Sequence, residues 1–150
     1  MATIVLLNGY YQEEWCRVLP TSYQSRGVGF FHTQNSLMRA LVRRGHRVIY
    51  LGYIKAENEG TYEGVEWLDI PTSTQKVMDL CLRRGVAAAI STESWEDWYL
   101  LFPHVKRLVS SHNSAYGGVY KDRIESPSVD NVIAVSEWHK ESLEANHPTL

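Results

Sequence analysis

Short runs of apolar residues alternate along the chain with longer stretches in which apolar residues recur at helical spacing. Most of the runs are continuous, which is typical of strands that are buried on both faces of a sheet. They predict strands at residues 3–8, 46–51, 65–70, 86–90, 105–110 and 131–136. Because strands and helices alternate, the pattern predicts an α/β fold in which helices cover both faces of a parallel sheet.

The clearest helix is predicted to begin near Val28. Leu37, Met38 and Leu41 belong to its apolar face, and the arginines of the same stretch lie largely off that face. Gly45 is expected to end the helix, because a glycine just after the last turn can adopt the left-handed conformation that closes it.

Three further helices and two long loops complete the pattern. Helices are predicted over residues 73–84, from Ser94 to a limit at Pro103, and after Ser136. The two loops are at residues 9–26 and 113–130. Loops of this length in a compact domain are usually either functional or disordered. Both are expected to follow the carboxyl ends of strands, the edge at which open parallel sheets bind ligands.

The composition fits one globular domain spanning residues 1–150, with 44% hydrophobic and 21% charged residues. A net charge of -2 provides no general attraction to nucleic acid or anionic lipid. Cys16 and Cys81 lack the spacing of a metal or redox motif. No apolar run approaches the roughly 20 residues that span a bilayer. We therefore expect a cytoplasmic protein without a nucleic-acid partner and with at most peripheral membrane contact.

Gly27 and Gly29 stand just before the first long helix. Glycines at such a place let backbone N–H groups approach an anion at the positive end of the helix, and a diphosphate is a plausible occupant. A turn without any ligand is the alternative. NAD is disfavoured, because a long insertion follows the first strand and His32 stands where a third glycine is needed.

Several segments, taken in order, resemble the amino-terminal domain of GT-B glycosyltransferases, especially those of family four. Residues 25–52 resemble the glycine loop, long helix, Arg-Gly-His turn and second strand of that family. Residues 109–113 resemble a strand that ends in a histidine facing the cleft. Residues 131–143 closely resemble the strand, serine and helix near the end of that domain. The resemblance covers nearly the whole chain.

The resemblance implies a retaining glycosyltransferase that moves a sugar from a nucleotide-diphosphate donor to a glycan, a lipid-linked or a small-molecule acceptor. Gly27, Val28 and Gly29 would face the donor diphosphate. His112 would lie between donor sugar and acceptor, where an imidazole can bind a hydroxyl or move a proton near neutral pH. The resemblance further implies that no cofactor or metal is needed. It also implies that a second, carboxyl-terminal domain supplies most donor contacts, so that residues 1–150 alone would be inactive.

Acceptor contacts are expected from Glu93, Trp95, Asn113 and Ser136. Glu93 follows a predicted strand end. Trp95 opens a helix whose aromatic spacing is most simply that of a buried face, with stacking on a sugar as the alternative. Ser136 can also be an ordinary helix N-cap with no ligand. A non-catalytic binding module of the same fold, or another nucleotide-dependent enzyme built on it, remain the alternative functions.

Overall fold

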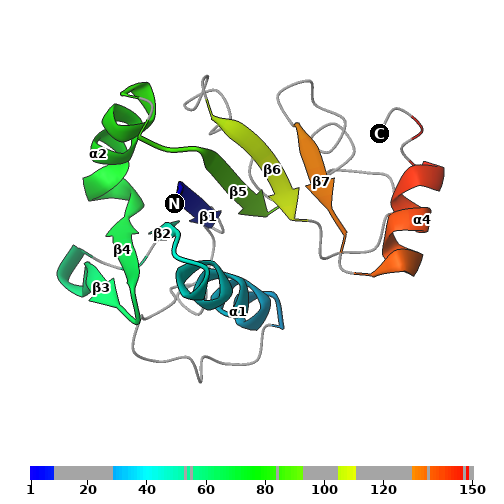
Figure 1. Cartoon of the computed structure of the whole chain (residues 1–150), viewed down its shortest axis with the longest axis horizontal. Helices are drawn as coiled ribbons and strands as arrows, with labels where there is room; N and C mark the ends of the chain where they lie inside the picture. Colours follow the sequence, from blue (N-terminus) through cyan, green and yellow to red (C-terminus); the bar gives the residue numbers. More distant parts are fainter. Residues whose placement is uncertain are drawn as a thin grey trace.

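The computed structural model describes residues 1–8, 29–52, 54, 56–83, 85–92, 105–110, 130–134, 136–146 and 148 (Figure 1). These residues form a seven-stranded sheet with the strand order β3-β4-β2-β1-β5-β6-β7. The strands are β1 (Thr3–Asn8), β2 (Arg47–Gly52), β3 (Gly60–Tyr62), β4 (Val65–Asp69), β5 (Ala88–Thr92), β6 (Lys106–Ser110) and β7 (Asn131–Ile133). The helices are α1 (Gly29–Arg43), α2 (Ile70–Leu82), α4 (Glu137–Asn146) and the short 3-10 helix η2 (Ala56–Asn58).

The fold is α/β, as predicted, but the sheet is mixed rather than wholly parallel. Each neighbouring pair is parallel except β3, which runs antiparallel to β4. Tyr62 pairs with Val65, so the two strands are joined by a two-residue turn in which Glu63 and Gly64 have φ angles of 51° and 80°. A turn with two positive φ angles matches the twist of a hairpin. The prediction missed β3 because a three-residue strand is too short to show a hydrophobic period.

Alternate residues of the central strands pack into two separate apolar clusters, one on each face of the sheet. Leu6 belongs to the cluster that contains Met38 of α1, and its neighbour Leu7 belongs to the cluster that contains Val77 of α2. Figure 1 shows α1 and α2 on opposite sides of the central strands. The apolar runs of β1, β2 and β4 are therefore strands buried on both faces, as the sequence predicted, whereas Asn131 and Ile133 of β7 are exposed.

The carboxyl end of α1 is closed as the sequence predicted. Gly45 has a φ of 81°. Its N–H donates to the carbonyl of Val42 at 2.9 Å, and the N–H of His46 donates to the carbonyl of Leu41 at 3.1 Å. This pair of bonds is the Schellman closure, which satisfies carbonyls that the last helical turn leaves open. The chain then enters β2 directly.

The start of α2 differs from the prediction. The strand before it ends at Asp69, one residue early, and the helix begins at Ile70 instead of residue 73. Proline stands in its first turn, where a backbone N–H has no helical partner and the fixed φ suits a helix. Proline there starts the helix rather than separating it from the strand. The helix predicted between Ser94 and Pro103 and most of both long loops lie outside the described residues.

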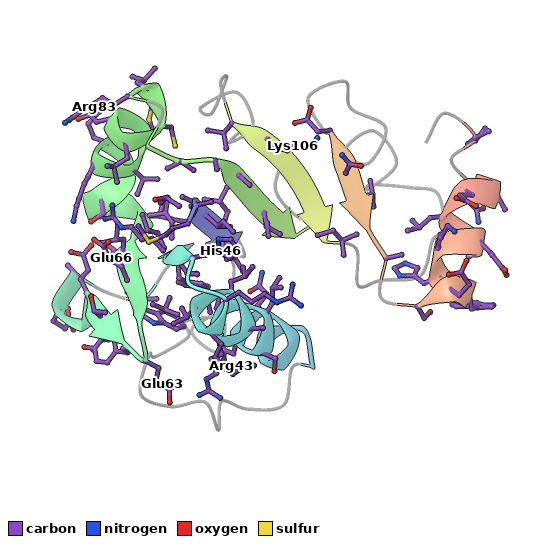
Figure 2. The ribbon with its side chains drawn as sticks, in the orientation of Figure 1. Arg43, His46, Glu63, Glu66, Arg83 and Lys106 are labelled. Atoms are coloured by element: carbon purple, nitrogen blue, oxygen red, sulfur yellow. The ribbon has the colours of Figure 1, made fainter. Side chains whose placement is uncertain are left out.

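Ion pairs connect the elements near the start of the parallel strands. Glu66 of β4, labelled in Figure 2, accepts hydrogen bonds from Arg47 of β2 at 2.9 Å and from Lys76 of α2 at 3.1 Å. Burial by itself would raise the pKa of the Glu66 carboxyl, but the hydrogen bonds and charges of the two cations outweigh it, so this pKa lies below its ordinary value. A second pair joins Arg39 of α1 to Glu63 at 2.6 Å.

Candidate functional site

Five strands present a row of mostly polar residue types at their carboxyl ends. Asn8 of β1 pairs in register with Gly52 of β2, and Gly52 pairs with Asp69 of β4. On the other side, Thr92 of β5 pairs with Ser110 of β6. The pairing of β1 with β5 ends with Leu7 and Ser91. Extending the same register by one residue places Asn8 beside Thr92. We call these five positions the carboxyl row.

The carboxyl row belongs to the sheet face that α1 covers. In four of these strands, the residue two positions before the carboxyl row belongs to the apolar cluster that includes Met38. These residues are Leu6, Tyr50, Trp67 and Ile90. Residues two apart in a strand share a face. We call these four strand residues the apolar layer. The residue types at these register positions therefore change from apolar to mostly polar within one step along the strands.

Gly52 lets the apolar layer extend up to the carboxyl row. A Cβ atom at this position would lie 2.6 Å from Cε1 and 2.9 Å from Cζ of the Tyr50 ring. That ring is buried and packs on Trp67 with a centroid separation of 4.3 Å. The space that a side chain would take at Gly52 is thus already filled by an aromatic ring.

Asp69 is held at one end of the carboxyl row by hydrogen bonds. Its Oδ1 accepts from the Ile54 N–H at 3.4 Å, and its own N–H donates to Oε1 of Glu59 at 2.9 Å. The Ser73 hydroxyl donates to the same Glu59 oxygen. Asp69 is 6% exposed. These bonds tie the segment after β2 to the start of α2, so the two carboxylates order this end of the row.

The amino end of α1 lies at the same edge as the carboxyl row. The opposite end of α1 leads into the start of the strands, where the Arg47 N–H donates to the Ala2 carbonyl at 2.9 Å. A helix of 15 residues is about 22 Å long, and a six-residue strand such as β2 is about 20 Å long. Running back along the sheet, α1 therefore brings Gly29, its first residue, to the level of the strand ends.

Gln34 is buried on the sheet-facing side of α1, one turn before Met38. Only 3% of it is exposed, and among the described residues neither Nε2 nor Oε1 finds a hydrogen-bond partner. Leaving a buried amide unpaired costs about 1–3 kcal/mol. Gln34 is not among the site residues predicted from the sequence, although a polar residue at i−4 from a core methionine is a visible break in an apolar stripe.

Two of the predicted site residues fall in the described part of the chain. Gly29 begins α1 at the edge of the carboxyl row. Ser136 caps α4: its Oγ accepts from the His139 N–H at 3.1 Å, and its carbonyl accepts from the Lys140 N–H at 2.9 Å. This is the geometry of an ordinary N-cap, one of the two interpretations that the sequence left open. The other predicted residues lie outside the described part: Gly27, Val28, Glu93, Trp95, His112 and Asn113.

Within the described ranges, no group of three or more His, Cys, Asp or Glu side chains is arranged to hold a metal ion. The helices of the same ranges include none with the length and apolar character to cross a bilayer. The thiol of Cys81 lies in the cluster under α2, where burial raises its pKa to about 12. A thiol with such a pKa is not a nucleophile at neutral pH.

No family model matches the sequence, and the search of curated proteins likewise finds no match.

Proposed function

We propose that the chain is the Rossmann-like, acceptor-side domain of a retaining GT-B glycosyltransferase. The observation that carries this proposal is the order of the six parallel strands across the sheet. Numbered along the chain without β3, they run third, second, first, fourth, fifth, sixth, which is the order of nucleotide-binding Rossmann folds. The resemblance to GT-B enzymes narrows that general class to sugar transfer.

The strand order also indicates where a ligand would bind. In open α/β sheets the crevice lies outside the carboxyl ends of the strands, where the order reverses. Here the reversal falls between β1 and β5, which end at Asn8 and Thr92 of the carboxyl row. The amino end of α1, with Gly29, reaches the same edge. A helix amino terminus contributes only about 0.3–1 kcal/mol to an exposed anion, so it would position a donor diphosphate more than bind it.

In the proposed reaction, His112 lies between the donor sugar and the acceptor. It follows Ser110 of the carboxyl row by two residues in the sequence. General acid or base help of this kind contributes about 10²–10⁴-fold to a rate, so a second domain must stabilise the leaving nucleotide. Closure of the two domains would exclude water from the transfer.

A dinucleotide-dependent enzyme is less well supported by the same sheet. Such enzymes carry an acidic residue about 20 positions after the glycine turn, where it binds the ribose hydroxyls. Here β2 ends at Gly52, which has no side chain that could bind the ribose hydroxyls. Asp69, the acidic member of the carboxyl row, ends the next strand over and already accepts the Ile54 N–H.

The proposal is tested by following backbone amide signals of the 15N-labelled chain during titration with UDP-glucose, GDP-mannose and UDP. We expect at least one of them to shift the Gly29 signal, and we expect NAD and S-adenosylmethionine to leave it in place. The Gly45 signal, at the other end of α1, is the internal control. A Gly29 signal that moves only with NAD, or with none of these compounds, contradicts the proposal.

Catalysis is tested in the protein that carries the donor-binding domain. His112→Ala is expected to slow release of nucleoside diphosphate in the presence of acceptor by about 10²–10⁴-fold while the circular dichroism spectrum stays unchanged. Turnover equal to that of the wild-type protein removes His112 from the mechanism.

A further inference from the structure

Gln34 occupies a position where the pattern of α1 calls for an apolar residue. It lies one helical turn before Met38 and two turns before Leu41, both of which pack against the apolar cluster of that face. Its amide is nevertheless buried, and no residue in the described part of the chain pairs with either of its polar atoms. A buried amide without a partner is unfavourable, and apolar side chains of similar size fit such a place better. Its presence therefore indicates a partner other than the residues that the structure describes.

The direction and level of Gln34 point its amide toward the carboxyl row. Each Cα–Cβ bond of an α-helix tilts toward the amino terminus, so this side chain extends over the turn that leads back to Gly29. Gln34 stands nine residues before Arg43, or about 14 Å along the helix axis. That distance equals about four strand residues, which sets it level with the carboxyl half of β2. Gln34 thus lies just beyond the apolar layer.

The partner must both donate and accept hydrogen bonds, because the amide offers N–H groups and a carbonyl. The row positions Asn8, Thr92 and Ser110 are also neutral residue types that can donate and accept. Neighbouring hydroxyls of a sugar have this character. We propose that Gln34 is a sugar-binding residue, whose amide pairs with two adjacent hydroxyls of a hexose held between α1 and the carboxyl row. The choice of a sugar as ligand rests on the proposed function.

The test compares wild-type protein with Gln34→Met, which keeps the length of the side chain and removes the amide. Without ligand, the variant is expected to be more stable, with a Tm raised by about 2–12 °C, because a buried amide with no described partner has been removed. The matched control is Gln75→Met on α2, where the exposed amide donates to Asp79 at 2.9 Å. There we expect almost no change in Tm.

Binding is measured with methyl glycosides of glucose, mannose and galactose, by the side-chain amide signals of 15N-labelled protein. The Gln34 signals are those that disappear in Gln34→Met. We expect at least one glycoside to shift them, and we expect its Kd to be about tenfold weaker in Gln34→Met and unchanged in Gln75→Met. The Gln34 signals can also be assigned in the wild-type protein through its own backbone resonances, so the measurement decides the question even if Gln34→Met folds poorly.

Two results would overturn the inference. One is a Gln34 amide that does not respond to any of the three glycosides; a long-lived cross-relaxation signal to water would then identify a buried water as the partner. The other is a Gln34→Met variant that binds the glycosides as the wild type does. Glycoside binding through Gln34 without any nucleotide-sugar response at Gly29 would uphold the inference and refute sugar transfer. A nucleotide-sugar response at Gly29 with the Gln34 amide unaffected would support sugar transfer and refute the sugar-binding role of Gln34.

Discussion

Replacing Gly52 by alanine tests whether the Tyr50 ring fills the space beneath the carboxyl row. The new methyl group would lie 2.6 Å from Cε1 of Tyr50, well inside van der Waals contact. The ring is 2% exposed and packs on Trp67, so it has no free direction in which to turn. Gly52 does not have a positive φ, so alanine adds no backbone strain there. The whole effect is steric, and overpacking of this kind costs about 1–3 kcal/mol.

Equilibrium unfolding in urea measures this loss, and each kcal/mol should also lower Tm by about 2–4 °C. Gly45→Ala is the contrasting variant, since a Cβ atom there meets nothing within 4 Å and only the φ of 81° penalises it. The decisive comparison is a double-mutant cycle with Tyr50→Leu, which removes the obstructing ring. Gly52→Ala should then cost at least 1 kcal/mol less than in the wild type. An equal cost in both backgrounds would refute the reasoning.

Three further predictions follow from single contacts. Cys81 should react with a thiol reagent only as fast as the protein opens, because its thiol is buried. The labelling rate is measured in the Cys16→Ser variant, in which Cys81 is the remaining cysteine, and fast labelling at pH 8 would contradict its burial. Because the pKa of Glu66 is lowered by folding, its contribution to stability is complete above the ordinary value of 4.5 and is lost as the pH falls below it. The stability difference between wild type and Glu66→Gln should therefore shrink from pH 6 to pH 3 in urea unfolding, and a constant difference would be inconsistent with this. Ser136→Ala should weaken the cap of α4 by about 1 kcal/mol and speed amide hydrogen exchange in its first turn about fivefold, whereas unchanged exchange at His139 would show that the cap is not needed.

The amino-acid sequence by itself determined the class of the fold and most of its elements. Apolar runs, most of them continuous, predicted six strands, and each of them is present with its ends within two or three residues. The continuous runs of β1 and β2 are reliable because a strand buried on both faces has few polar positions. Gly45 also determined where α1 stops, since its left-handed conformation depends on the residue itself. These are local properties, and they can be interpreted without knowing what lies nearby.

Only the tertiary structure decided which residues share the carboxyl row. Asn8, Gly52 and Asp69 are distant in sequence and become neighbours through strand register. Their register depends on which strands pair, and the pairing of β2 with β4 and of β1 with β5 is not encoded in any one segment. The importance of Gln34 likewise depends on burial by other parts of the chain, because a glutamine in an isolated helix would simply be hydrated. Long-range packing therefore creates the candidate site from residues that have no special signal alone.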